Sequence, residues 1–120
     1  MSHIVQIRTQ VKDSAAVEAA CRRLHLPAPS QGTFQLFSDT VTGLAVNLPG
    51  WRYPAVFDLA NGESRYDNFN ERWGKSEELH KFLQAYACEL TKIESRRRGH
   101  TVTEQQLEDG SIKLTINVEG

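Results

Sequence analysis

Cysteine is scarce in this sequence, since Cys21 and Cys88 are the only two among 120 residues. Each falls within a helical pattern, and no secretory signal is visible ahead of the first strand pattern. We therefore expect two buried, reduced thiols in a cytoplasmic protein. No window approaches the ~18 uninterrupted apolar residues that a membrane-spanning helix needs, so no membrane association is predicted.

The sequence also lacks the short motifs that carry common catalytic and cofactor chemistry. It contains no phosphate-binding loop, dinucleotide fingerprint, HExxH zinc motif, GxSxG elbow or CxxC pair, and no internal repeats. We therefore expect no cofactor and no metal, and the absences favour a non-enzymatic protein over an enzyme.

Neither sign of charge is in excess. The 14 Lys and Arg residues against 15 Asp and Glu residues give a formal net charge of −1, which argues against a surface that binds nucleic acid or anionic membrane throughout. Hydrophobic residues make up 39% and charged residues 24%, as in ordinary globular domains. A single domain over residues 1–120 is expected, and a homodimer stays open on base rates alone.

Periodicity predicts six strands and two helices. Residues alternate between apolar and polar over 3–11, 33–37, 40–48, 55–59, 102–107 and 112–118. A helix is predicted after a cap at Asp13 or Ser14, and a longer one from its N-cap Ser76 to a stop at Gly99, while 60–75 shows no period. The order β-α-β-β-β-α-β-β predicts an α+β fold, a two-layer sandwich with a mostly antiparallel sheet and both helices on one face.

Short segments near both ends of the chain resemble a known family. They are Met1–His3, Ile7–Gln10, Phe82–Ala87, Gly99, Val102–Gln106 and Asp109–Leu114. With them the chain resembles the hypothetical chloroplast reading frame thirty-five family of cyanobacteria and algal plastids, part of a bacterial group of domains of unknown function (twelve-fifty-seven). The resemblance covers residues 1–11 and about 79–118, and the middle keeps the order of strands and a tryptophan, Trp73, ahead of the long helix.

Two departures from the family identify the chain as a divergent bacterial member. Ile4 stands where the family usually has an aromatic residue, and the chain ends Val118-Glu119-Gly120 in place of a basic-aromatic pair. The resemblance implies no activity, because the family has none established. Its gene neighbourhood, in some bacteria near ATPase-type machinery, implies a component of an assembly.

Aromatic residues beside arginines form the first candidate site. Trp51, Arg52 and Tyr53 follow a Pro-Gly turn, and Arg72 and Trp73 lie in the irregular segment. Tryptophan, tyrosine and arginine are enriched at protein–protein hot spots, but large side chains also pin loops over a core. The favoured function is therefore an adaptor or subunit of a protein complex with an unidentified protein partner.

A basic cluster gives the alternative of RNA or single-stranded nucleic-acid binding. Arg96, Arg97 and Arg98 end the long helix, and Lys92 lies one turn before them. The same residues complement the negative end of the helix dipole, which explains them without nucleic acid. No aromatic pattern of the kind that stacks RNA bases accompanies them.

An enzyme of unassigned type is the second alternative. Asp58, His80, His100 and Glu104 are the polar groups worth testing, provided that they converge in one pocket. Glu77 and His80 share a helix face with the spacing of di-iron ligands, but one such motif cannot complete that site. We expect these two side chains to be solvated.

Overall fold

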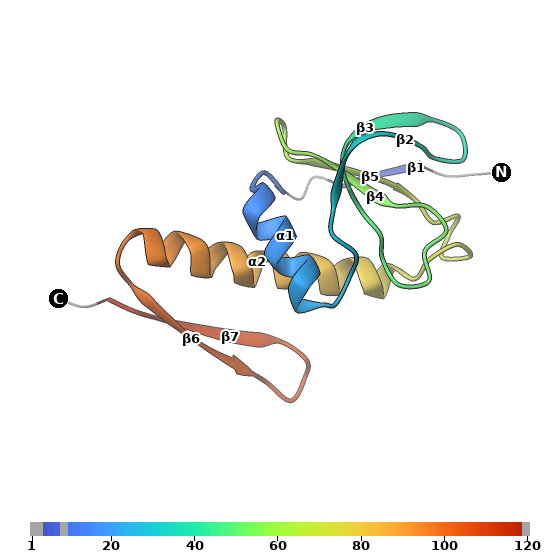
Figure 1. Ribbon diagram of the computed structural model, residues 1–120. Helices are drawn as coiled ribbons and strands as arrows, with labels where there is room; N and C mark the ends of the chain where they lie inside the picture. Colours follow the sequence, from blue (N-terminus) through green and yellow to red (C-terminus); the bar gives the residue numbers. More distant parts are fainter. Residues whose placement is uncertain (1–3, 8–9, 119–120) are drawn as a thin grey trace.

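Two antiparallel sheets and two helices make up the fold in the computed structural model, which describes residues 4–7 and 10–118 (Figure 1). The larger sheet has five strands in the order β1-β5-β4-β3-β2. Their bounds are Ile4–Ile7 for β1, Ser30–Gln35 for β2, Thr40–Val46 for β3, Ala55–Asp58 for β4 and Glu63–Asp67 for β5. The helices are α1 (Ser14–Arg23) and α2 (Ser76–Arg97), and the smaller sheet is the hairpin of β6 (Thr101–Gln106) and β7 (Ile112–Asn117).

The α+β class, the antiparallel pairing and the order of the predicted elements are confirmed. The structure adds one strand, β5, inside the segment for which the sequence showed no period. It also places the C-terminal hairpin in a sheet of its own. The first strand covers Ile4–Ile7, and residues 3 and 8–9 of the segment predicted as strand lie outside the described residues. Residues 10–11 do not belong to a strand, so the prediction was too long at this end.

Both helices pack against one face of the five-stranded sheet. Phe57 of β4 stacks on Phe82 of α2 with ring centroids 5.4 Å apart, and both side chains are fully buried. Asp13 caps α1 by accepting from the backbone N–H of Ala16 at 3.0 Å. The hydroxyl of Tyr86 on α2 accepts from the backbone N–H groups of Lys12 and Asp13 at 3.1 and 3.2 Å. The start of α1 is therefore tied directly to the middle of α2.

A second, smaller core lies on the opposite face of the sheet. It consists of Leu36, Val41, Ala45 and Val56, with Phe34 and Tyr53 packed against it. Ala45 and Val56 alternate with residues of the main core along β3 and β4, as the two-residue period of a strand requires. Both faces of the central strands are thus covered.

The ends of α2 are held in different ways. Ser76 is the first helical residue and Lys75 the N-cap, so the predicted N-cap is displaced by one residue, and the carboxylate of Glu71 accepts from the backbone N–H of Ser76 at 2.9 Å. At the other end Gly99 has φ +78° and donates to the carbonyl of Arg96, as the predicted helix stop requires.

An ion-pair network attaches the hairpin to the helices. Arg23 of α1 binds both carboxylate oxygens of Glu104 on β6 at 2.7 Å, and Lys92 of α2 lies 2.9 Å from the same carboxylate. Glu89 joins both cations at 3.3 Å. The hydrogen bonds from Arg23 and then from Lys92 lower the pKa of Glu104 to about 2. These ion pairs therefore attach the middle of the hairpin to both helices.

The molecule is elongated, with principal extents of 55 × 32 × 23 Å. Its Cα radius of gyration is 15.3 Å, against about 13.6 Å for a compact domain of this length. Figure 1 shows the reason, because α2 runs past the five-stranded sheet and the hairpin lies beside its far half. Neither described helix is long and apolar enough to cross a membrane.

Candidate functional site

Aromatic rings gather around Trp73 on the surface. The ring centroid of Trp73 lies 4.7 Å from that of Phe69, 5.2 Å from that of Phe37 and 5.7 Å from that of Tyr53. Phe37 is 51% exposed, and the other three rings are half-buried. Three separate segments supply them: the β2–β3 turn, the loop before β4 and the loop between β5 and α2.

Two exposed arginines lie over these rings. The guanidinium carbon of Arg52 is 5.0 Å from the ring centroid of Trp73 and 5.6 Å from that of Tyr53. The guanidinium carbon of Arg72 is 5.1 Å from the ring centroid of Phe69. Cation–π contacts at exposed sites contribute ~0.5–1 kcal/mol each, which favours these stacked positions of the side chains. We call this surface the aromatic–arginine patch, and its members are Phe37, Arg52, Tyr53, Phe69, Arg72 and Trp73.

A left-handed turn presents half of the patch. Phe69, Asn70 and Glu71 have φ of +46°, +52° and +70°, three consecutive non-glycine residues in the left-handed region. Such a conformation costs ~1–2 kcal/mol per residue, less for asparagine. Two hydrogen bonds enclose the turn: the backbone N–H of Trp73 donates to the carbonyl of Asn68 at 2.9 Å, and the Glu71 carboxylate accepts from the backbone N–H of Ser76 at the start of α2. Strain held in this way by its surroundings clusters at functional sites.

The structure brings four of the five predicted interaction residues together and separates the fifth. Arg52, Tyr53, Arg72 and Trp73 belong to the patch. The ring of Trp51 instead packs against the main core, 5.3 Å from Tyr66, and its indole N–H donates to the carbonyl of Lys75 at 3.0 Å. Trp51 therefore fixes its loop to the main core and does not belong to the exposed patch.

Sequence reasoning missed Phe37 and Phe69 as members of the patch. The sequence predicts a strand over 33–37 that includes Phe37, whereas β2 ends at Gln35 and leaves Phe37 in the turn. The available signal for Phe69 was its position four residues before Trp73 and three residues before Arg72.

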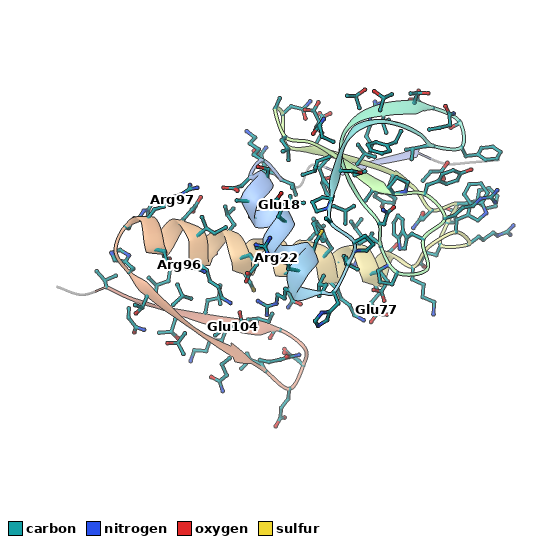
Figure 2. All side chains as sticks on the ribbon, viewed as in Figure 1. Glu18, Arg22, Glu77, Arg96, Arg97 and Glu104 are labelled. Atoms are coloured by element: carbon teal, nitrogen blue, oxygen red, sulfur yellow. The ribbon has the colours of Figure 1, made fainter. Side chains whose placement is uncertain are left out.

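The basic residues of the nucleic-acid alternative lie elsewhere. Figure 2 shows Arg96 and Arg97 at the end of α2 opposite to Glu77, and the structure leaves Arg96, Arg97 and Arg98 exposed. Lys92 differs from these arginines, because its charge is compensated by ion pairs with Glu89 and Glu104. The loops that carry the aromatic residues of the patch lie beyond the opposite end of α2 (Figure 1), so these residues do not accompany the cluster.

The four polar groups of the enzyme alternative do not converge. His80 and His100 lie near opposite ends of α2, which is about 30 Å long at 1.5 Å per residue. Glu104 is engaged by Arg23 and Lys92. Asp58 lies on the five-stranded sheet, in a pocket that none of the other three lines.

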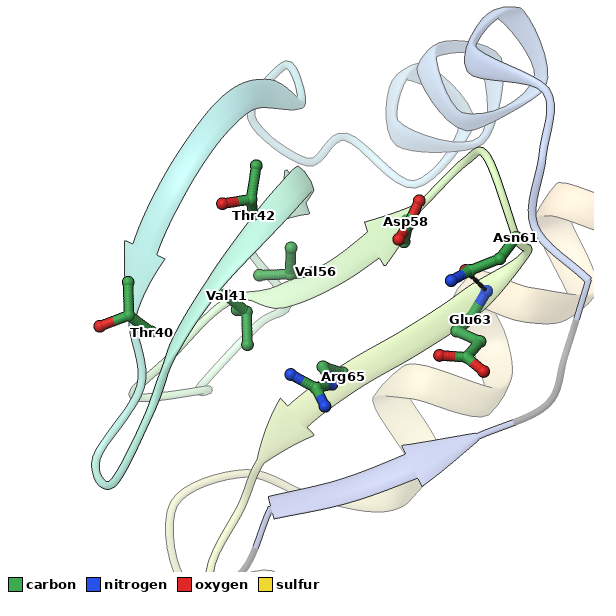
Figure 3. A pocket seen from close by; sticks show the side chains of 8 residues that line it. All are labelled: Thr40, Val41, Thr42, Val56, Asp58, Asn61, Glu63 and Arg65. Atoms are coloured by element: carbon green, nitrogen blue, oxygen red, sulfur yellow. Dashed lines mark hydrogen bonds between the residues drawn. The ribbon is translucent and has the colours of Figure 1, made fainter.

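That pocket has a volume of about 330 Å³ and lies on β3, β4 and β5 (Figure 3). Asp58 and Asn61 form the β4–β5 turn, where they accept from the backbone N–H groups of Ala60 and Glu63 at 3.1 and 2.9 Å. Arg65 lies 3.7 Å from Asp39. The pocket is polar, but its side chains are used to build the turn and the sheet surface.

A metal site and a reactive cysteine have no support in the part of the chain that the structure describes. No three His, Cys, Asp or Glu side chains there group as a metal site would require. Cys21 and Cys88 are both buried and unpaired. Burial raises the pKa of Cys21 to about 11 and raises that of Cys88 as well, so both thiols stay protonated at neutral pH.

Comparison with known proteins gives no match to a family model, to a curated protein or to a solved structure. The family resemblance of the terminal segments therefore stays a prediction, and the function is argued from the surface itself.

Proposed function

We propose that the protein is a non-enzymatic interaction module, an adaptor or small subunit of a protein complex, that binds its partner through the aromatic–arginine patch. One observation carries the proposal. Arg52 and Arg72 are stacked on Trp73, Tyr53 and Phe69 at a surface where the ring of Phe37 is half exposed. Tryptophan, tyrosine and arginine are the residues that most often dominate binding energy.

The patch is ordered before any partner binds. Each guanidinium lies over a ring, and Arg52 donates its backbone N–H to the carbonyl of Trp73 at 2.8 Å. Fixing a long side chain on association costs ~0.5–1.5 kcal/mol. Stacking has already restricted these two arginines, so a partner loses less free energy in ordering them.

The chemistry of the patch favours a partner segment with carboxylates beside an apolar side chain. Among the described residues neither Arg52 nor Arg72 forms an ion pair. A guanidinium that stacks by its face keeps its N–H edges for a carboxylate. Trp73, with Phe37 packed against it, supplies apolar surface beside Arg52.

Aromatic rings with arginine also bind single-stranded nucleic acid, but the surroundings favour a protein. Glu71 and Glu78 line a pocket of about 430 Å³ together with Arg72, and Asp39 follows Phe37 by two residues. A phosphate backbone has to cross the patch along its length and meets these carboxylates, whereas a single carboxylate of a protein partner needs to reach only the edge of one guanidinium. Nucleic-acid grooves need positive charge along the whole path of the strand.

The test is co-purification of the tagged full chain from its host with and without nuclease, with two variants. Arg52→Glu/Arg72→Glu reverses the charge of two exposed side chains, and Arg96→Glu/Arg97→Glu is the matched control at the far end of α2. We expect a stoichiometric protein partner, resistant to nuclease, that the first variant loses and the control keeps. Loss only in the control, or co-purified nucleic acid, would contradict the proposal.

A further inference from the structure

The C-terminal hairpin carries most of the large apolar side chains that are exposed in the described part of the chain. Leu107 is 39% exposed, Ile116 46% and Val118 65%, and only Phe37 of the aromatic–arginine patch is comparable. A two-stranded hairpin is marginally stable, and further strands or a helix are needed to bury its apolar face. Ile116 and Val118 lie together at the open end of the hairpin, and contiguous exposed apolar side chains are typical of an interaction surface.

Ile116 belongs to the face that the hairpin turns toward the helices, and Val118 follows it by two residues, whereas Leu107, directly after Gln106, alternates to the outer face. The face toward the helices holds three pairs in register, Val102–Ile116, Glu104–Leu114 and Gln106–Ile112. Glu104 reaches Arg23 and Lys92, which identifies the face as the inner one. Leu114 is half-buried there, whereas Ile116 is exposed.

One edge of β7 has no neighbour among the described strands. β7 pairs with β6 from Ile112 to Asn117, and no other described strand pairs with either of them. Figure 1 shows the hairpin beside α2 and away from the five-stranded sheet. The outer edge of β7 therefore offers backbone N–H and C=O groups to a further strand.

We infer that β7 pairs antiparallel with β7 of a second copy of this chain, about a two-fold axis at Thr115. In an antiparallel pair, residues directly opposite one another point to the same face. This register places Leu114 opposite Ile116 of the other copy, and Ile112 opposite Val118. The inner faces of both hairpins then join in one four-stranded sheet, and the exposed side chains of Ile116 and Val118 acquire apolar neighbours.

The outer face is compatible with the same register. Thr115 lies opposite Thr115 of the other copy, and Lys113 lies opposite Asn117, so no like charges meet. Like charges directly opposite one another destabilise a strand pair. The segment Ile112–Val118 is therefore self-complementary on both of its faces.

The edges of β6 and β2 do not fit a second copy in this way. β6 centred on Glu104 sets two carboxylates opposite each other, and β6 centred on Thr103 sets Glu104 against Val102. β2, at the edge of the larger sheet, has Phe34 as its single large apolar residue. The choice of a second copy rests on the self-complementarity of β7.

The proposed dimer leaves the aromatic–arginine patch free on both copies. The segments that build the patch lie at the end of the molecule opposite to the hairpin (Figure 1). An interface of two short strands is small, so the dissociation constant is expected in the micromolar range. The inference does not depend on the proposed function, because the two surfaces share no residue.

The test is sedimentation equilibrium of the full chain from about 1 to about 500 µM. Thr115→Lys places two ammonium groups opposite each other at the axis, on an exposed position of the outer face. Thr103→Lys is the matched control, since Thr103 is exposed and pairs with Thr115 within the hairpin, one strand further from the axis. We expect a reversible dimer that Thr115→Lys weakens about fivefold or more and Thr103→Lys leaves within about twofold.

Two further measurements separate a lost interface from a lost fold. Mixing the Thr115→Lys and Thr115→Glu variants is expected to restore a heterodimer, which a misfolded hairpin would not do. Amide exchange over 112–118 is expected to slow as the wild-type concentration rises. A wild-type chain that stays monomeric up to about 500 µM, or equal dimerisation of the Thr115→Lys and Thr103→Lys variants, would overturn the inference.

Discussion

Arg52 contacts Trp73 through both its backbone and its side chain. Its backbone N–H donates to the carbonyl of Trp73 at 2.8 Å, and its guanidinium carbon lies 5.0 Å from the ring centroid of the same residue. These contacts join the loop before β4 to the loop between β5 and α2. The aromatic–arginine patch therefore behaves as one surface, although separate segments build it.

The Arg52→Ala substitution is expected to cost about 0.5–1 kcal/mol of unfolding free energy, because it removes an exposed cation–π contact and keeps the backbone hydrogen bond. Urea denaturation followed by tryptophan fluorescence measures the cost. Arg98→Ala, at an exposed arginine for which no ring contact is found among the described residues, is expected to change the free energy by less than about 0.5 kcal/mol. Equal costs would show that the stacking has no energetic role.

The Tyr86→Phe substitution is expected to destabilise the fold by about 1–3 kcal/mol. It removes the hydroxyl that accepts from the backbone N–H groups of Lys12 and Asp13, and leaves these donors part-buried without that acceptor. Chemical denaturation gives the magnitude. The matched control is Tyr53→Phe, at a half-exposed surface ring, for which a change below about 0.5 kcal/mol is expected.

The Gly74→Ala substitution is expected to cost about 1–3 kcal/mol. A Cβ at this position would come within 2.5 Å of Cδ2 of Trp51, whose ring is held between the core and the carbonyl of Lys75. The comparison is Gly32→Ala on β2, where the nearest atom lies at 3.4 Å. Thermal unfolding of both variants tests this, and similar melting temperatures would contradict the packing that we describe for Trp51.

Glu104 gives the hairpin a defined dependence on pH. Its pKa is lowered from 4.5 to about 2 by Arg23 and Lys92. A carboxyl with a lowered folded-state pKa stabilises the fold above its unfolded-state pKa, and this contribution is lost as the pH falls. The stability difference between wild type and Glu104→Gln is therefore expected to be about 1 kcal/mol at pH 7. It should shrink between pH 4.5 and pH 2.

Thermal unfolding at a series of pH values measures that difference. Glu108→Gln, at an exposed glutamate beyond the end of β6, serves as the control. A constant difference between wild type and Glu104→Gln over this range would show that the network does not hold the hairpin.

The strands with β-branched and aromatic residues could be predicted from the sequence, but β5 could not. Its residues, Glu63–Asp67, include a single residue typical of strands, Tyr66. β5 forms because it pairs with β1 on one side and β4 on the other, a tertiary effect that local propensity does not encode. The same limit applies to the hairpin, whose alternation predicts two strands but not the sheet to which they belong.

The residue types of the candidate site could be predicted, and its membership only in part. The neighbouring positions of Trp51, Arg52 and Tyr53 predicted one cluster. The chain turns between these residues, so the side chain of Trp51 packs against the core and does not join the other two. The contact of Trp73 with Phe37 joins residues that are 36 positions apart by their numbering. Only the folded arrangement of the loops reveals such a contact.

The most direct test of the proposed function is site-specific photo-crosslinking from the patch. Phe37→p-benzoylphenylalanine puts the crosslinker on a ring that is 51% exposed, and Glu94→p-benzoylphenylalanine puts it on an exposed residue of the far half of α2. After irradiation in the native host, we expect one protein partner to crosslink from position 37 and not from position 94. The same crosslinks from both positions, or none from position 37, would contradict the account.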